Sequence, residues 1–230
     1  MDKIWWLKEW LRKGSINIFG MPFAGKDTVG RQVAQVLDGQ FLSSGQILRD
    51  YEAANSVMDL TTTGRWTPTE SFKRIVLPHL GDEQYEDKAL ILGGIGRWDG
   101  EEEFVEEALM KAEHPLRVVV LLNLSEQEIR NRWEVAQVGG DQIEVAGLGV
   151  AGGLDAAARE LKREVRADDD DWRKVESRMN EFRDKTWPVI EYYRAMGMLV
   201  TVNGRQTREK VLLETINKLY DYATLHPHEY

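Results

Sequence analysis

Hydrophobic positions along the chain fall into short runs of strand length that alternate with stretches of helical spacing. The first strand pattern lies at residues 15–19, and further apolar runs lie around Phe41 and at residues 89–92, 118–122 and 198–202. Between the first two runs, apolar residues recur at helical spacing over about 28–37, and the pattern ends before Gly39. Strands that are apolar throughout suit a sheet buried on both faces, and alternation with helices favours parallel strands. The pattern therefore predicts an α/β fold in which helices flank a five-stranded parallel sheet.

Residues 1–13 predict a short amphipathic helix ahead of this fold. Ile4, Leu7 and Leu11 share one helical face, tryptophans lie beside them, and charged residues occupy the rest of the surface. We expect this helix to pack on the chain's own core or on a sister subunit, which makes it a candidate docking surface for a partner or for the chain itself. Its basic polar side leaves attachment to a membrane surface as the alternative.

Three segments nearer the C-terminus complete the organisation. Residues 134–166 are rich in glycine, alanine and valine and lack aromatic residues, which predicts a separate insertion. Helical spacing returns over 169–196, where Pro188 is expected to kink or break the helix. A last amphipathic helix is expected over 207–225.

Composition narrows the classes of protein and of chemistry. The chain has 230 residues, 42% of them hydrophobic and 30% charged, as expected for a globular protein. Its net charge of -9 disfavours nucleic acid as a partner, because phosphate binding needs a basic face. Cysteine is absent, which excludes disulfides, thiolate metal sites and cysteine nucleophiles. No apolar run approaches the roughly 20 residues that span a bilayer, and the N-terminus carries charges where a secretion signal would be apolar. We therefore expect a cytoplasmic protein without an integral membrane segment.

The turn after the first predicted strand has the spacing of a phosphate-binding loop. Gly20, Gly25 and Lys26 match G-x-x-x-x-G-K, and the hydroxyl that usually follows the lysine comes one residue later, at Thr28. Glycines let the backbone wrap an anion, the next helix directs unpaired amides at it, and lysine adds a mobile charge. Glycines in a tight turn have a purely structural explanation too, but lysine at this spacing does not. The residues expected to hold the phosphates of ATP are Gly20, Phe23, Ala24, Gly25, Lys26, Asp27 and Thr28.

Several later stretches of the sequence are interpreted together with this loop. They are LSSGQILR at 42–49, GGIGR at 93–97, Arg132, the segment 166–178 with its acidic run, TWP at 186–188 followed by two tyrosines, and VNG at 202–204. Together with the loop they resemble a divergent member of the adenylate kinase family of P-loop nucleoside monophosphate kinases, whose patterns include S-T-G-D-x-L-R, D-G-F-P-R and R-x-D-D. The resemblance runs in order from Ile16 to Leu219 and leaves the N-terminal helix and the insertion unmatched.

The resemblance implies an enzyme that transfers the terminal phosphate of ATP to AMP or a related nucleoside monophosphate, with Mg²⁺ as cofactor. It implies a P-loop kinase domain over 14–230, with a monophosphate-binding subdomain at 44–80 and a lid at 134–166. Phosphoryl transfer depends on positioning and on neutralising charge, which suits a set of cations. The implied catalytic residues are Lys26, Arg97, Arg132, Arg166 and Arg178. The implied monophosphate-binding residues are Ser44, Gly45, Arg49, Gly94, Arg97 and Glu101.

Two acidic positions of the family are lost in this chain. Gly93 stands where D-G-F-P-R begins with aspartate, and Gln46 stands where S-T-G-D ends in aspartate. Asp27 stands where the family loop has glycine. Because Mg²⁺ prefers oxygen ligands, Asp27 is a candidate replacement carboxylate beside Thr28. The alternative is that Asp27 only caps the helix that begins there.

Glu101 stands where an adenine-reading member of the family carries glutamine. An ionised carboxylate only accepts hydrogen bonds, and guanine presents two donors side by side, so Glu101 indicates a GMP-preferring kinase. The alternative is an acidic residue that merely favours a helix start, with AMP as the substrate.

Three further departures weaken the case for catalysis. Phe23 replaces a loop glycine, Gly96 stands where the family has a proline, and Ala136 stands where a further lid arginine is expected. They leave a non-catalytic nucleotide sensor, or a kinase for a small metabolite, as the competing functions.

Overall fold

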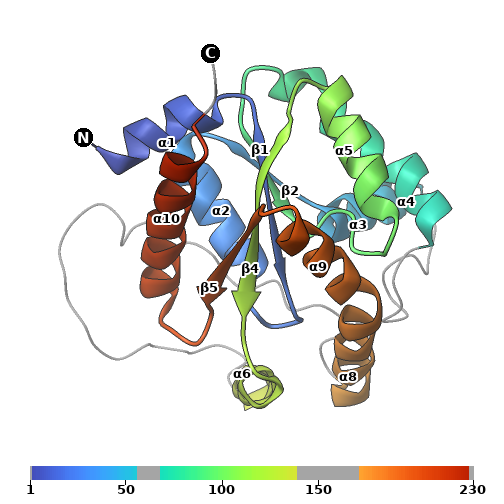
Figure 1. The fold of residues 1–230 in the computed structure, drawn as a ribbon. Coiled ribbons are helices and arrows are strands. Elements are labelled where there is room, and N and C mark those ends of the chain that lie inside the picture. Colours follow the sequence, from blue (N-terminus) through green and yellow to red (C-terminus); the bar gives the residue numbers. More distant parts are fainter. Residues whose placement is uncertain (1, 56–67, 139–170, 228–230) are drawn as a thin grey trace.

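The computed structural model describes residues 2–55, 68–138 and 171–227 and contains the predicted sheet (Figure 1). Its strands are β1 (Ser15–Gly20), β2 (Gln40–Ser43), β3 (Leu90–Gly93), β4 (Leu116–Asn123) and β5 (Leu199–Asn203). Neighbouring strands run parallel in the order β2-β3-β1-β4-β5. The prediction of a five-stranded parallel sheet is confirmed, and β1, which leads into the glycine-rich turn, lies at its centre.

Helices cover both faces of the sheet (Figure 1). The α-helices are α1 (Lys3–Leu11), α2 (Lys26–Leu37), α3 (Ser44–Asn55), α4 (Thr69–Ile75), α5 (Glu101–Lys111), α6 (Glu126–Val138), α8 (Trp172–Glu181), α9 (Trp187–Ala195) and α10 (Arg208–Leu225). Short 3-10 helices follow α4 at η1 (Leu77–Gly81) and η2 (Glu83–Tyr85), and a π-helix, η3 (Phe182–Thr186), joins α8 to α9.

The strands are buried at most positions because the sheet packs against helices on both faces. On β1, Ile16 and Ile18 join the cluster that contains side chains of α1, α2 and α10. Phe19 points to the opposite face and packs with side chains of β4 and α9. Successive residues of a strand face opposite sides, so a doubly covered strand loses the usual alternation of polar and apolar residues.

The N-terminal helix packs on its own chain. Leu7 and Leu11 are buried in the main hydrophobic cluster, and the Trp6 ring meets the Tyr220 ring of α10 edge to face at 5.4 Å between centroids. The indole nitrogen of Trp10 donates to the carbonyl oxygen of His226 over 2.9 Å. Of the readings that the sequence left open, packing on the chain's own core is the one observed for this face.

The helical segment near the C-terminus passes through Pro188 without a break. Pro188 is the second residue of α9, and the five residues before that helix form η3. Proline has no N–H to donate within a helix, and a π-turn is one way in which a helix absorbs such a local mismatch. The expected break is thus absent, and a π-helical segment precedes the proline.

The predicted subdomains are only partly within the described residues. Of residues 44–80, the described parts form α3, α4 and η1, whose apolar side chains pack with those of β3 and α5. Of the 134–166 insertion, residues 134–138 are the last turn of α6, and the rest lies outside the described residues.

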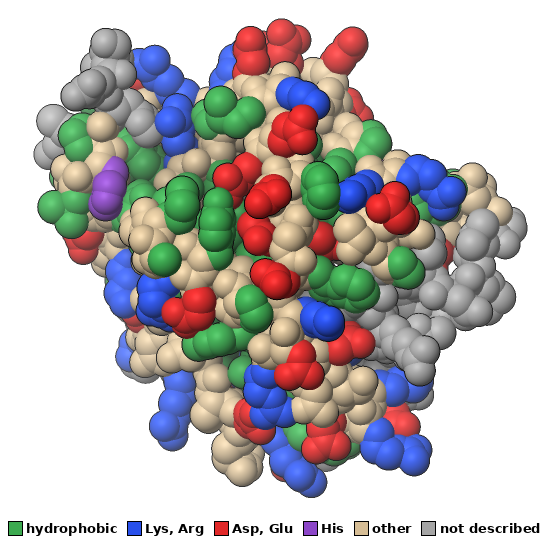
Figure 2. Space-filling view, turned by 45° about the vertical axis from the view of Figure 1, so that its right-hand side comes forward, with side chains coloured by type: hydrophobic (Ala, Val, Ile, Leu, Met, Phe, Trp, Pro, Cys, Tyr) green, Lys and Arg blue, Asp and Glu red, His purple; other side chains and the backbone are tan. Residues whose placement is uncertain are grey.

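Figure 2 shows acidic side chains gathered along the middle of the face that α5, α8 and α9 line. This agrees with the net charge of -9. The cations discussed next lie in a cleft at the carboxyl end of the sheet.

Candidate active site

The glycine-rich turn joins the end of β1 to the start of α2. Phe23 has φ 63° and Gly25 has φ 86°, so the chain passes twice through the left-handed region before α2 begins at Lys26. Glycine adopts this conformation without steric strain. The backbone of Phe23, which stands where the family has glycine, is strained. The turn places the amino end of a 12-residue helix, with its unpaired N–H groups, at the carboxyl end of the central strand. This is the geometry of an anion-binding loop.

A second loop, between β3 and α5, lies against the first. Asn17 of β1 fixes it by donating to the Ile95 carbonyl over 2.7 Å and accepting from the Ile95 N–H over 3.3 Å. Gly94 and Gly96 have positive φ, which lets the loop turn tightly beside the phosphate-binding loop. A Cβ atom on Gly94 would stand 3.6 Å from Cε of Lys26, so the lysine passes close to this loop.

Arg97 is held in the second loop by two hydrogen bonds. Its Nε donates to the Gly94 carbonyl over 2.7 Å, and its Nη2 donates to the Ser44 hydroxyl over 2.8 Å. The structure therefore brings together three of the predicted monophosphate-binding residues, Ser44, Gly94 and Arg97.

Cations converge on one cleft between these loops. Its lining consists of Phe19, Gly20, Pro22, Lys26, Gly94, Arg97, Arg178 and Phe182. Arg178 is only 9% exposed although it is an arginine, and it reaches the cleft from α8. Three of the predicted catalytic cations, Lys26, Arg97 and Arg178, thus come together from three separate elements. A positive cleft beside the carboxyl ends of parallel strands is where α/β folds bind ligands.

Arg132 is placed differently from these three cations. From α6 it donates through Nη1 to the carbonyls of Phe23 and Ala24, at 3.2 and 3.3 Å, and through Nη2 to the carbonyl of Gly204 at 2.6 Å. Burial lowers the pKa of this guanidinium from its ordinary value. Arg132 therefore ties the phosphate-binding loop to the loop between β5 and α10.

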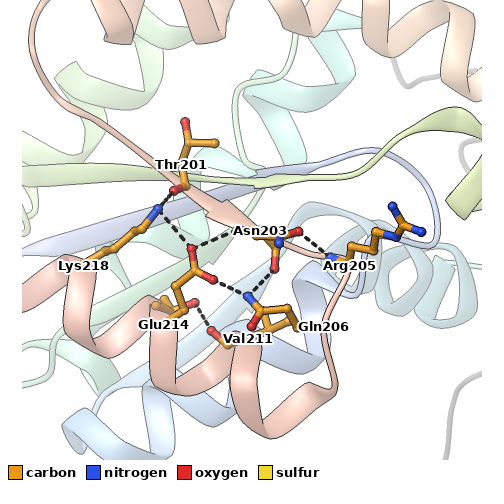
Figure 3. A network of polar contacts seen from close by, with 8 residues as sticks. Thr201, Asn203, Arg205, Gln206, Val211, Glu214 and Lys218 are labelled. Carbon is orange, nitrogen blue, oxygen red and sulfur yellow. Dashed lines mark hydrogen bonds and ion pairs between the residues drawn. The ribbon is translucent and has the colours of Figure 1, made fainter.

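A polar network stabilises the loop between β5 and α10 (Figure 3). The Glu214 carboxylate accepts from the Asn203 N–H over 3.2 Å, from Lys218 over 3.0 Å, and from the Gln206 side chain. Burial raises the pKa of Glu214, but these hydrogen bonds outweigh it and leave the pKa below its ordinary value. The Gly204 carbonyl, which accepts from Arg132, thus belongs to a loop that side chains of α10 stabilise.

Glu101 is committed to the loop that carries Arg97. The carboxyl is 4% exposed, and its Oε2 accepts from the backbone N–H groups of Arg97 and Trp98 at 3.1 and 3.2 Å. Burial raises its pKa, and hydrogen bonds from Trp98, Thr69 and Arg97 offset part of that rise. The geometry favours a loop-capping role for Glu101 over recognition of a base.

The remaining predicted residues lie away from the cleft lining or outside the described part. Arg49 of α3 donates to the Gln46 side chain over 2.7 Å, and Gly45 is the second residue of the same helix. Arg166 lies outside the described residues. Sequence reasoning missed Asn17 and Phe182. The signal for Asn17 was a polar residue between Ile16 and Ile18 in a predicted strand.

The loop residues fit the way proteins hold Mg²⁺. Asp27 and Thr28 lie in the first turn of α2, and Asp27 Oδ1 is 2.9 Å from Nζ of Lys26. No group of three or more His, Cys, Asp or Glu side chains suited to a metal occurs among the described residues. Mg²⁺ usually binds through one or two carboxylates plus substrate phosphates, and a lone carboxylate beside a phosphate loop meets that requirement.

A parallel sheet with a phosphate-binding loop after its central strand and a cationic cleft defines a P-loop phosphotransferase. The family model described as adenylate kinase matches residues 18–198, and the chain belongs to that family. It is therefore a nucleoside monophosphate kinase.

Curated relatives agree with this assignment. The adenylate kinase of Petrotoga mobilis is 28% identical over 207 residues, which cover 89% of this chain and 96% of the relative. That of Deinococcus radiodurans is 29% identical over 205 residues, covering 86% and 93%. In the part of the chain that the structure describes, no helix is long and apolar enough to cross a membrane.

Proposed function

We propose that this kinase acts on AMP and that Lys26, Arg97 and Arg178 are its catalytic cations. The convergence of these three side chains on one cleft beside the phosphate-binding loop carries the proposal. In the reaction, an oxygen of the AMP phosphate attacks the terminal phosphorus of ATP, the bond from that phosphorus to the bridging oxygen breaks, and two ADP molecules form. The charge spreads over the transferred group, and fixed cations neutralise it at no cost of reorganisation.

Each cation has a role that follows from its position. Lys26, next to the loop amides, contacts the terminal phosphates of ATP. Arg97, oriented by Gly94 and Ser44, holds the monophosphate. Arg178 enters from α8 and contacts the group in transit between them. Arg132 acts as a positioning residue, because its donors hold the carbonyls of the loop.

Mg²⁺ is the proposed cofactor, with the Thr28 hydroxyl and the Asp27 carboxylate as the chain's own oxygen groups beside it. When bound, the ion neutralises phosphate charge and orients the transferred group. We place the enzyme in the cytoplasm because ATP and nucleoside monophosphates are cytoplasmic metabolites.

AMP is preferred over GMP because of how Glu101 is used. Guanine recognition would need a carboxylate free to accept from two neighbouring donors. The Oε2 atom of Glu101 already accepts from two backbone amides. The similarity to proteins named adenylate kinase supports the same base.

The test is diphosphate formation from ATP and Mg²⁺ with AMP, GMP, CMP, UMP or dTMP, for wild type and Lys26→Ala. AMP should be the best acceptor, and Lys26→Ala should abolish turnover. Lys111→Ala, at an exposed position at the end of α5, is the matched control and should behave as wild type. Preference for GMP would instead support the hypothesis that Glu101 recognises guanine. ATP binding without turnover on any acceptor would favour the sensor or a small-metabolite kinase.

A further inference from the structure

The strand next to β1 ends without the acid that P-loop enzymes use there. In many such enzymes an aspartate at the end of a strand beside the loop holds Mg²⁺ together with the loop hydroxyl. Here β3 pairs with β1 and ends at Gly93. A Cβ atom on Gly93 would lie 2.8 Å from Cζ and 3.2 Å from Cε2 of Phe41, closer than side chains tolerate. A side chain at the end of this strand would therefore require the Phe41 ring to shift.

Phe41 is fixed in that place. Its ring also occupies the space that a side chain on Gly30 would need, so two glycines on two elements accommodate one ring. The Arg31 guanidinium lies over the ring at 5.1 Å from its centroid. Gly93 thus lies where β2, β3 and α2 pack closely around the Phe41 ring.

A carboxylate reaches the same space from the other side. Oδ1 of Asp27 lies 3.4 Å from the position of the missing Cβ atom of Gly93, and this oxygen is buried. Asp27 belongs to the first turn of α2, one residue before Thr28. A carboxylate therefore lies beside the end of β3, and α2 contributes it instead of β3.

We propose that Asp27 is the carboxylate that couples ATP binding to Mg²⁺ in this enzyme, in place of an acid at the end of β3. The inference rests on ATP binding at the loop, as proposed above. A carboxylate this close to the loop repels the phosphates of metal-free ATP and attracts the ion of the metal complex, so it acts in opposite directions on the two ligands. An aspartate that only pairs with Lys26 or caps α2 repels both ligands, so its removal would tighten binding of both.

The experiment measures the dissociation constant of ATP with EDTA and with Mg²⁺, without any acceptor. The ratio of the two constants is the coupling. In Asp27→Asn we expect the coupling to fall about tenfold, the size seen when a group that supports a metal is removed. Asp38→Asn removes the same charge at the opposite end of α2 and should leave the coupling unchanged. We expect ATP with Mg²⁺ to bind Asp27→Asn more weakly than wild type, and tighter or unchanged binding in the presence of Mg²⁺ would overturn the proposal.

A second set of variants moves the carboxylate back to the strand. Asp27→Gly with Phe41→Leu removes the charge and the ring atoms that fill the space, and adding Gly93→Asp should restore most of the coupling. A folded triple variant whose coupling stays low would contradict the inference. If thermal unfolding shows that the triple variant is not folded, the comparison of Asp27→Asn with Asp38→Asn decides. Wild-type protein that binds ATP in neither condition would refute the proposed function itself.

Discussion

Single residues determine how firmly the phosphate-binding loop is held, and Arg132 contributes two side-chain hydrogen bonds to it. One guanidinium donates to three carbonyls on two loops. Only a planar group with several donors spans such a set, so lysine is no substitute. The same argument applies to Asn17, whose amide holds the Ile95 peptide from both sides.

Arg132→Ala should lower the free energy of unfolding by about 2 kcal/mol, since hydrogen bonds from a charged donor are lost and buried carbonyls remain. ATP should also bind more weakly because the loop is no longer fixed. Urea denaturation and ATP titration measure both effects. Arg130→Ala, which breaks an exposed ion pair with Glu134 and a cation–π contact with Trp172, should cost about 1 kcal/mol or less. Equal losses in the two variants would mean that the loop contacts contribute nothing.

Burial of a carboxyl on α5 should give stability a characteristic dependence on pH. Glu102 is 7% exposed, and burial, with repulsion from Asp99 and Glu103, raises its pKa above the ordinary 4.5. The native state then binds more protons than the unfolded state, so this group's contribution is most favourable below 4.5 and declines as pH rises through the raised pKa.

Glu102→Gln removes that titration, and its free energy of unfolding relative to wild type should increase from about pH 4 to about pH 8. Denaturation at the two pH values measures the difference. Glu103→Gln, an exposed neighbour on the same helix, is the control and should show a smaller trend. A constant difference for Glu102→Gln would rule out the raised pKa.

Among the elements, α1 shows how a terminal helix becomes part of the core. Its apolar face, recognised from spacing alone, packs on α10 and α2, while Trp5 on the other side is 55% exposed. Leu7→Ala should cost about 3 kcal/mol of unfolding free energy, as buried leucines do. Trp5→Ala should stay within about 0.5 kcal/mol. Thermal or urea unfolding distinguishes them, and similar costs would contradict the packing of α1.

For the whole molecule, ligand binding and folding are linked. ATP with Mg²⁺ at about 100 times its dissociation constant should stabilise the native state by about 2.7 kcal/mol. For a chain of this size that is a rise in melting temperature of roughly 5–10 °C. Lys26→Ala should abolish most of the rise and Lys111→Ala should keep it, as measured by thermal unfolding. An unchanged rise in Lys26→Ala would place ATP outside the loop.

The sequence by itself determined the order of strands and helices, the glycine-rich loop and the family, because these depend on local spacing. Periodicity over a few residues is enough to identify a buried strand or an amphipathic helix. It also supplied the cations of the cleft, through the family's motifs. It left open whether Glu101 reads a base, what Arg132 contacts and what lies beside the Asp27 carboxylate.

Only the tertiary structure showed what these side chains contact, because such contacts join distant segments. Arg132 meets the Phe23 carbonyl across 109 positions of the chain, and Asn17 meets Ile95 across 78. The absence of a side chain at Gly93 became intelligible once the Phe41 ring was seen against it. Local spacing specifies which face of an element is buried, whereas the direction and partners of a polar side chain are set by what folding brings beside it.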